Sequence, residues 1–252
     1  HMHAGVARYT MLETVRQYMH ARLVAASEEP AARRLHFHFY LALAESADRA
    51  FHRGEPRAFI AALDRERDNL VTAHKWCDRA GGSDELGLEL VNAMRGYWVE
   101  RHCVPDLPRV DYDPIAQGYR LILEALDRSG ARTRDVVRCI ALAGAAQLAC
   151  YSNRIAESLG YLDESLSIAR EIGDGERVAW RLTARAYYLS WLGEHAVARQ
   201  AAEEALSSAR ATGKRKTIVL GLHVLAFTKL IVGEVGAAEE LAFESLKMGE
   251  PT

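Results

Sequence analysis

The sequence lacks the features that mark membrane proteins and nucleic-acid-binding proteins. No apolar run approaches the roughly 18 residues that a membrane-spanning helix needs, and no signal peptide is visible. The 32 basic and 34 acidic residues nearly balance, so charge gives no reason to expect a nucleic-acid partner. We therefore predict a chain that neither spans a membrane nor binds nucleic acid directly.

Cysteine is also scarce, and its spacing is irregular. The chain has four cysteines and no CxxC pair. Scattered thiols without a pairing pattern are typical of proteins in a reducing compartment. We predict a cytoplasmic protein in which these thiols are reduced and mostly buried: Cys77, Cys103, Cys139 and Cys150.

Residue sets for catalysis or cofactor binding are missing as well. The segment Gly213–Thr217 matches only the end of a phosphate-binding loop, because the glycine needed five residues earlier is Ser208 and no strand precedes it. His74 and Cys77 could share one helix face, but zinc needs three or four ligands and the nearby sequence supplies no others. No Ser/His/Asp set is recognisable. We therefore expect no catalysis, no metal and no cofactor.

What the sequence does contain is an internal repeat. The tripeptide Glu–Ala/Ser–Leu occurs four times at intervals of 40 residues, and such a period is typical of a repeat architecture. Small residues precede the last three copies by 19 and by 7 residues, and a turn-former lies between them. The copies are Glu124–Leu126, Glu164–Leu166, Glu204–Leu206 and Glu244–Leu246. The small columns are Ala146, Ala186 and Ala226, then Ser158, Ala198 and Ala238, and the turn column is Asn153, Gly193 and Gly233.

These columns predict that each unit is a helix, a tight turn and a second helix. Only Ala, Ser or Gly fits where two helices cross at short distance, so small residues mark the crossing points. Gly and Asn leave the helical region of backbone conformation at the least cost, which suits them to the turn. A leucine opens each unit: Leu142, Leu182 and Leu222.

Small residues inside both helices and glycine at the turn resemble the tetratricopeptide repeat. The period of 40 residues exceeds the period of about 34 that is usual for that family, and we expect the extra residues to lengthen both helices. Gly173 and Gly213 would then close the second helices. The resemblance implies an all-α fold, a right-handed α-solenoid of tetratricopeptide-like helix pairs.

We expect an N-terminal helical segment over residues 4–82 and the repeats over residues 83–252. The first segment would hold three helices, and the repeats would form four helix pairs, about eleven helices in all. The first pair is irregular because an insertion with three prolines interrupts it. The expected units are 83–131, with the insertion at 103–114, and then 132–172, 173–212 and 213–252.

The N-terminal helix carries a second resemblance. We expect this helix over Arg8–Ala26, with Thr10 and Glu13 as a capping box. The segment Arg8–Tyr18 resembles the junction between the ATPase module and a helical repeat array in bacterial signal-transduction ATPases of the LuxR-type and cyclase-associated (STAND) kind. The segment Arg67–Leu70 resembles a later element of the same family. The resemblance implies that this chain is the sensor or scaffold arm of such a regulator. Since His1–His3 looks like a cloning remnant, we expect an excised fragment.

In arrays of the tetratricopeptide kind, the first helix of each unit lines a concave groove. The corresponding positions here are aromatic and apolar with few charges, which favours binding of a partner protein, a peptide (including the parent's own ATPase module) or a small-molecule inducer. The same stripe would also arise if these side chains only packed between neighbouring helices. A plain assembly scaffold that senses no small molecule is the alternative function. The candidate contact residues are Gln147, Tyr151, Trp180, Thr183, Tyr187, Trp191, His223 and Phe227.

The last predicted helix carries apolar residues for which no following unit is present in the sequence. A terminal unit of a solenoid needs a polar outer face. We therefore expect either a homo-oligomer or a frayed last helix. The apolar residues are Val235, Leu241, Phe243 and Leu246.

Overall fold

The computed structural model describes residues 2–3, 6–7, 11–52, 56–77, 84–104, 107 and 110–249. Two short antiparallel strands, β1 (Met2–His3) and β2 (Val6–Ala7), precede the helices. All other regular structure in these ranges is helical. The first helices are α1 (Glu13–Ala25), α2 (Glu29–His52), α3 (Pro56–Trp76), α4 (Asp84–Cys103) and α5 (Pro114–Asp127), followed by a short 3₁₀ helix, Ser129–Arg132. The remaining helices are α6 (Val136–Tyr151), α7 (Ile155–Glu171), α8 (Gly175–Trp191), α9 (His195–Thr212), α10 (Arg215–Ile231) and α11 (Val235–Gly249).

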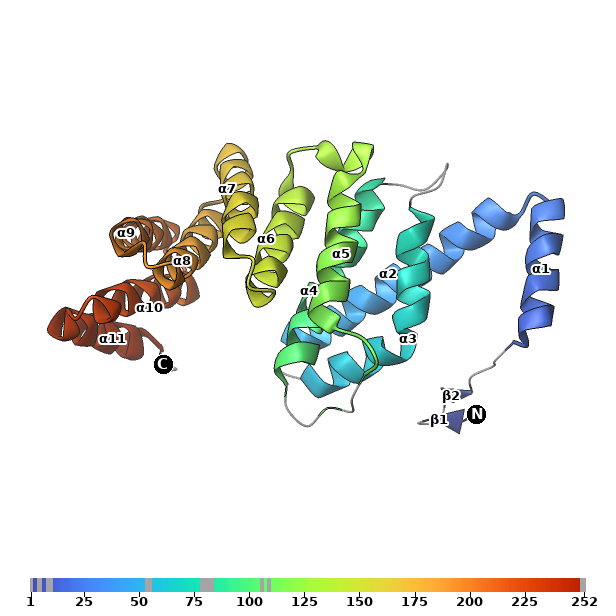
Figure 1. Cartoon of the computed structure of the whole chain (residues 1–252), viewed down its shortest axis with the longest axis horizontal. Coiled ribbons are helices and arrows are strands. Elements are labelled where there is room, and N and C mark those ends of the chain that lie inside the picture. Colours follow the sequence, from blue (N-terminus) through green and yellow to red (C-terminus); the bar gives the residue numbers. More distant parts are fainter. Residues whose placement is uncertain are drawn as a thin grey trace.

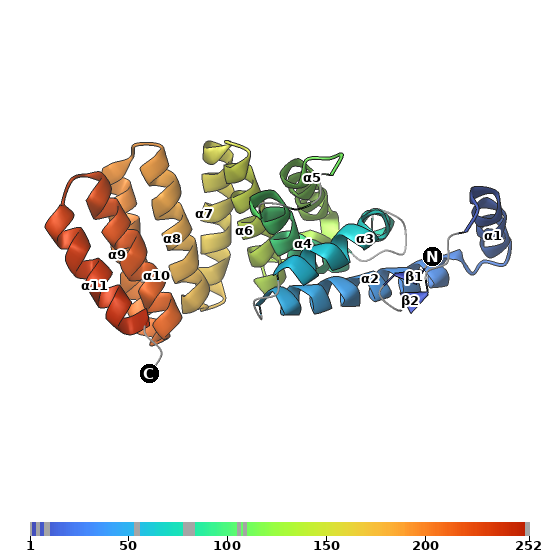
Figure 2. The same cartoon turned by 90° about the horizontal axis from the view of Figure 1, so that it is seen from below.

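The helices stack in sequence order along one long axis (Figures 1 and 2). Helices α4 and α5 pair, and so do α6 and α7, α8 and α9, and α10 and α11, which confirms the predicted α-solenoid of helix pairs. Helices α2 and α3 pair in the same way, and α2 packs on α4 as α4 packs on α6. Only α1 stands apart, with α2 as its main contact.

The turns explain the period. The backbone angle φ is positive at residues 153, 173, 193, 213 and 233, every 20 residues, so the turns within and between pairs share one geometry. After most of these helices, an amide N–H reaches back five residues to a carbonyl, as Arg154 does to Ala149 and Glu194 does to Leu189. Each half-unit is therefore one helix of about 17 residues and one short turn, and two half-units give the period of 40. The five residues are Asn153, Gly173, Gly193, Gly213 and Gly233.

The small columns lie where the helices cross, as predicted. Ala146, Ala186 and Ala198 are fully buried. Ser158 is also fully buried, and its hydroxyl donates to the carbonyl of Ala146 at 2.7 Å, so the polar atom is satisfied where the two helices meet. This burial agrees with the register proposed from the sequence in α6 to α9, whereas Ala226 in the last pair is only partly buried.

Two further sequence predictions concern the start of the first helix and the position of the insertion. The predicted first helix is present as α1, but it begins at Glu13 rather than at Arg8, and its N-cap residue, Leu12, makes no side-chain cap, so the predicted capping box is wrong. Glu13 bonds instead to Arg16 at 2.6 Å, and Thr10 lies outside the described residues. The predicted insertion falls between the end of α4 and the start of α5, and the side chain of Asp113 caps α5.

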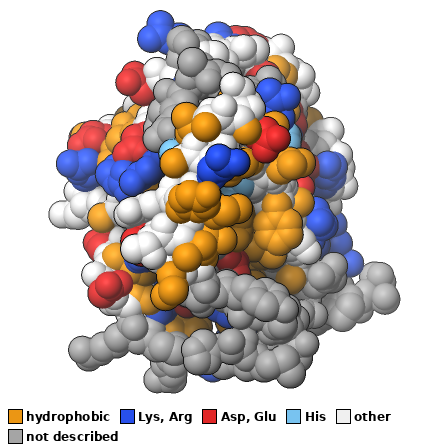
Figure 3. Space-filling view, turned by 90° about the vertical axis from the view of Figure 1, so that its right-hand side faces the viewer, with side chains coloured by type: hydrophobic (Ala, Val, Ile, Leu, Met, Phe, Trp, Pro, Cys, Tyr) orange, Lys and Arg blue, Asp and Glu red, His pale blue; other side chains and the backbone are white. Residues whose placement is uncertain are grey.

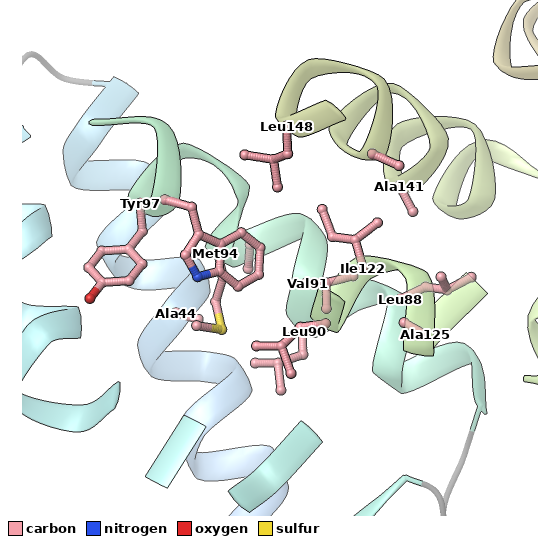
Figure 4. Close-up of a cluster of buried hydrophobic side chains, with 14 of the residues drawn as sticks. Ala44, Leu88, Leu90, Val91, Met94, Tyr97, Ile122, Ala125, Ala141 and Leu148 are labelled. Atoms are coloured by element: carbon pink, nitrogen blue, oxygen red, sulfur yellow. The ribbon is translucent and has the colours of Figure 1, made fainter. Parts of the chain in front are cut away.

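The hydrophobic core is a ribbon that follows the helix pairs. One cluster of buried side chains extends from α2 to α7, and Figure 4 shows part of it, with side chains from α2, α4, α5 and α6 in one layer. A second cluster extends from Leu166 on α7 to Leu225 on α10, with side chains of α11 packed against it. A smaller cluster around Ala146, Leu162 and Tyr188 lies between them. The second and third clusters both contain residues of the pair α6/α7 and of α8, so the core continues from one pair to the next.

Among the described helices, none is both long enough and apolar enough to cross a lipid bilayer.

Candidate partner-binding face

The candidate contact residues lie on α6, α8 and α10, the first helices of the three regular pairs. We call the side of these helices that carries the exposed members of the set the first-helix face. Trp191 is 55% exposed, while Trp180 and Tyr151 are each 46% exposed. Tyr187, Phe227 and Gln147 are partly buried, and His223 is exposed. The solvent therefore reaches most of the predicted set.

Three of the predicted residues form one aromatic cluster, which a fourth ring joins. The ring of Tyr187 lies 4.9 Å from that of Phe227 and 6.3 Å from that of Trp191, measured between centroids. Tyr188 stacks on Trp191 at 5.5 Å. We use the term aromatic cluster for Tyr187, Tyr188, Trp191 and Phe227. Such spacings are typical of favourable aromatic pairs.

The repeat and the helix period together build this cluster. Tyr187 and Trp191 are four residues apart, so both project from one side of α8. Phe227 follows Tyr187 by one full period and lies on α10, which packs on α8. Tyr187 therefore meets its counterpart in the next pair, and the cluster joins two pairs.

Comparison with solved structures agrees with this architecture. The chain is similar to "BtubC (BKLC) from P. vanneervenii", with a TM-score of 0.60 and 13% identity, over 88% of this chain and 94% of that one. It is also similar to a structure described as "Podosopora anserina putative kinesin light chain nearly identical TPR-like repeats", with a TM-score of 0.58 and 13% identity, over 87% of this chain and 95% of that one. A variant of that second protein gives a TM-score of 0.59 and 14% identity, over 88% and 96% of the two chains.

The fold is a tetratricopeptide-like repeat array. No protein-family model matches the chain. No curated protein matches it either. At such low identities the solved structures establish the fold alone.

Within the tetratricopeptide-like array, Tyr151 occupies a different place from the aromatic cluster. Its ring lies 5.8 Å from that of His102, and its hydroxyl lies 3.8 Å from the sulfur of Cys103, at the end of α4. Burial, followed by contact with Cys103, raises the pKa of Tyr151 to about 12, so the phenol is neutral at pH 7. Tyr151 therefore extends the first-helix face toward α4 and does not join the cluster.

The prediction for Thr183 needs correction. This side chain is only 4% exposed, so it cannot contribute polarity to the first-helix face. Ser190 on the same helix is also buried, and its hydroxyl donates to the carbonyl of Ala186 at 2.8 Å. Both residues lie on the side of α8 that packs within the array.

Gln147 is held by a residue that the sequence argument overlooked. Arg95 on α4 donates from Nη1 to Oε1 of Gln147 at 3.1 Å. Burial lowers the pKa of Arg95, although a guanidinium stays charged at pH 7. The polar part of the first-helix face therefore includes a positive charge from the neighbouring pair.

The sites that we discounted from the sequence have structural roles in the array. His74 is buried, and its Nε2 lies 2.9 Å from the carbonyl oxygen of Leu121. Gly213 is the left-handed residue that ends α9, so the segment Gly213–Thr217 is a turn between two pairs. Within the described part of the chain, no group of three or more His, Cys, Asp or Glu residues could hold a metal ion.

Proposed function

We propose that this tetratricopeptide-like array is a protein-interaction arm whose first-helix face binds an apolar segment of a partner protein. The observation that carries the proposal is the aromatic cluster, which spans two helix pairs and leaves Trp191 more than half exposed. Aromatic side chains offer a large contact area with few rotatable bonds, and they dominate binding hot spots.

The exposure of Trp191 argues against a role in packing alone. Trp98 and Tyr97, which do fill the core, are fully buried. Trp191 stacks on Tyr188 with its outer part open to solvent, and that arrangement holds a ring in place without hiding it. A ring that is fixed before binding loses little entropy when a partner covers it.

We further propose that the array belongs to a cytoplasmic signal-transduction ATPase regulator, with the ATPase module as a partner. The resemblance of Arg8–Tyr18 supports this proposal. Figure 3 views the end of the molecule that carries α1 and α2, where apolar side chains gather at the surface. Met11 and Leu12, which immediately precede α1, and Tyr18 on α1 are all exposed. Contiguous exposed apolar surface is a mark of interaction sites. A plain assembly scaffold and an inducer sensor are the alternatives that a binding measurement distinguishes.

A calorimetric titration of the array with the ATPase module tests the proposal. Trp191→Ala should weaken binding by about 2 kcal/mol or more, which is about 30-fold in affinity. Phe227→Ala should also weaken it. The matched control is Phe243→Ala, which removes an exposed aromatic ring from α11, a second helix.

Circular-dichroism melts of the same variants provide the control for folding. If the first-helix face binds the partner, Trp191→Ala should melt close to the parent while its affinity falls. If the ring serves packing only, the variant should melt early and the folded fraction should bind as tightly as the parent, and the proposal is then wrong. A thermal-shift screen of small molecules separately tests the alternative that the array senses a small-molecule inducer.

A further inference from the structure

A cleft of about 310 Å³ lies between α1, α2 and α3, at the end of the molecule that Figure 3 views. Sites for small molecules typically have volumes of about 300–1,000 Å³, so the cleft is large enough for a small ligand. Each of the three helices contributes side chains three or four residues apart, which one side of a helix presents together. The cleft shares no residue with the first-helix face, which α6, α8 and α10 carry, so it is a separate candidate site.

Most of the surface of the cleft is apolar. Met19 and Leu23 are four residues apart on α1, and both line the cleft together with Met11, which precedes that helix. The indole of Trp76 on α3 is only 6% exposed, and its ring lies 5.6 Å from that of Phe37, so it is held in place by the core. Because methionine sulfur interacts favourably with aromatic rings, a wall of methionines and an indole suits an aromatic ligand.

The charged side chains of the cleft already have partners. Glu29 on α2 accepts a hydrogen bond from Nε of Arg33 at 2.6 Å, and it lies 3.0 Å from Nε2 of His20 on α1. Arg16 on α1 forms an ion pair with Glu13 at 2.6 Å. A charged ligand would have to compete with these pairs and lose its hydration on entering an apolar cleft. The lining therefore favours a neutral ligand.

Two polar groups that line the cleft, the indole N–H of Trp76 and the ring of His36, have no hydrogen-bond partner within the described part of the chain. The indole nitrogen of Trp98 is sealed in the core, whereas that of Trp76 stays accessible. Burial, followed by the charge of Arg33, lowers the pKa of His36, so its ring is neutral at pH 7 and has one donor and one acceptor nitrogen. A few such polar groups in an apolar cleft are what orient a small ligand.

We propose that this cleft binds a small, neutral aromatic molecule that carries a hydrogen-bond acceptor, such as an aromatic carbonyl compound. The aromatic ring of the ligand lies among Met19, Leu23 and Trp76, and its oxygen accepts from the indole N–H of Trp76 or from the ring of His36. The ligand thereby joins α1 to α2 and α3, although α2 alone is the main contact of α1 without it. The inference does not depend on the proposed first-helix face.

Titration of the isotope-labelled whole chain with acetophenone, followed by NMR, is the test. Each of the four tryptophans gives one indole N–H signal, and the signal that Trp76→Phe removes belongs to Trp76. Acetophenone should shift the Trp76 signal in a saturable manner and leave the signals of Trp180 and Trp191 in place. If the Trp76 signal does not move up to the solubility limit of acetophenone, or if only Trp180 or Trp191 responds, the proposal is wrong.

Two neighbouring alanines on α2 provide a matched pair of variants. Ala32 lines the cleft, whereas Ala31 is exposed and does not line it. Ala32→Leu should therefore fill part of the cleft and weaken the binding of acetophenone by about tenfold or more, while Ala31→Leu should bind it as the parent does. The signals of Trp98, Trp180 and Trp191 should keep their parental positions in both variants, which shows that the fold is intact. Equal affinity of the two variants would overturn the proposal.

A ligand without the oxygen tests the hydrogen bond and needs no protein variant. Isopropylbenzene has nearly the shape of acetophenone but no acceptor, so the polar groups of the cleft would stay unpaired when it binds. It should bind about tenfold more weakly than acetophenone. Equal affinity for the two compounds would refute the acceptor, and with it the proposed class of ligand. None of these outcomes bears on the first-helix face, which Trp191→Ala and Phe227→Ala test separately.

Discussion

Gly118 and Gly160 both lie inside helices, yet the structure predicts opposite outcomes when each is replaced by alanine. Alanine favours a helix interior over glycine by about 0.5–1 kcal/mol. At Gly160 on α7, an added Cβ meets nothing within 4 Å, so this gain should appear in full. At Gly118 on α5, the Cβ would lie 2.4 Å from Cδ2 of Trp98, and the whole indole is fully buried.

The indole of Trp98 cannot move aside without displacing its core neighbours. Overpacking of this kind costs about 1–3 kcal/mol, which exceeds the helical gain at most values in that range. We expect Gly118→Ala to destabilise the chain by about 1–2 kcal/mol and Gly160→Ala to stabilise it by up to about 1 kcal/mol. For a chain of this length, each kcal/mol shifts the midpoint of thermal unfolding by about 2–4 °C.

Circular-dichroism melts of the two variants measure the shift, and tryptophan fluorescence reports whether the indole has moved. Gly118→Ala should melt lower than the parent with altered emission, and Gly160→Ala should melt higher with unchanged emission. If both variants melt higher, the close approach of α5 to Trp98 is wrong, and so is the packing of α4 against α5.

Three further predictions follow from the same structure. Ala198→Leu should destabilise the array by about 1–3 kcal/mol in urea unfolding, because Ala198 is fully buried at a helix crossing. The control Glu203→Gln, at an exposed position, should change the stability very little. If Ala198→Leu unfolds at the same urea concentration as the parent, the repeat register is wrong. Leu246 is 62% exposed although its counterpart Leu206 is 5% exposed, so we expect the chain to self-associate in sedimentation and Phe243→Glu/Leu246→Glu to be monomeric. A monomeric parent with slow amide exchange through Leu246 would refute that expectation. Burial alone would raise the pKa of Asp174, the cap of α8, but hydrogen bonds from the backbone amide and guanidinium of Arg177 lower it below its ordinary value. The stability that this cap contributes is therefore fully present above the ordinary aspartate pKa of about 3.9. It is lost as the pH falls through the lower pKa of the folded state. Melts between pH 6 and pH 2.5 should therefore show a smaller acid-induced loss for Asp174→Asn than for the parent, and an equal loss would contradict the role of Asp174.

The sequence was sufficient to predict the array because its strongest signals are periodic. The columns that contain Ala186, Ala198 and Gly193 mark crossing points and turns, and steric rules fix what those positions can hold. The start of α1 could not be obtained in the same way. A capping box at Thr10 is a local pattern without a second copy, and the helix begins at Glu13 with no side-chain cap.

The first-helix face was harder to predict because one helix offers several adjacent stripes. A spacing of three or four residues selects a side only to within tens of degrees. Thr183 was therefore assigned to the open side although it is buried, and Tyr188 was left out although it stacks on Trp191. Trp191 and Phe227 were found because their equivalence across 40 residues adds a second constraint.

Arg95 carried no signal in the sequence. Arginine on a predicted helix is normally a solvated residue that pairs with a nearby carboxylate, as Arg185 does with Asp163. Only the packing shows that Arg95 bonds to Gln147 of the next pair.

The central claim is that the first helices of the pairs form the binding face, and hydrogen exchange tests it most directly. The measurement compares the amide exchange of the chain alone with that of the chain saturated by the ATPase module. The account predicts slower exchange across residues 180–191 of α8 and 220–231 of α10, with little change in α7, α9 and α11. Protection confined to the second helices, with α8 and α10 unchanged while the partner is bound, would contradict it.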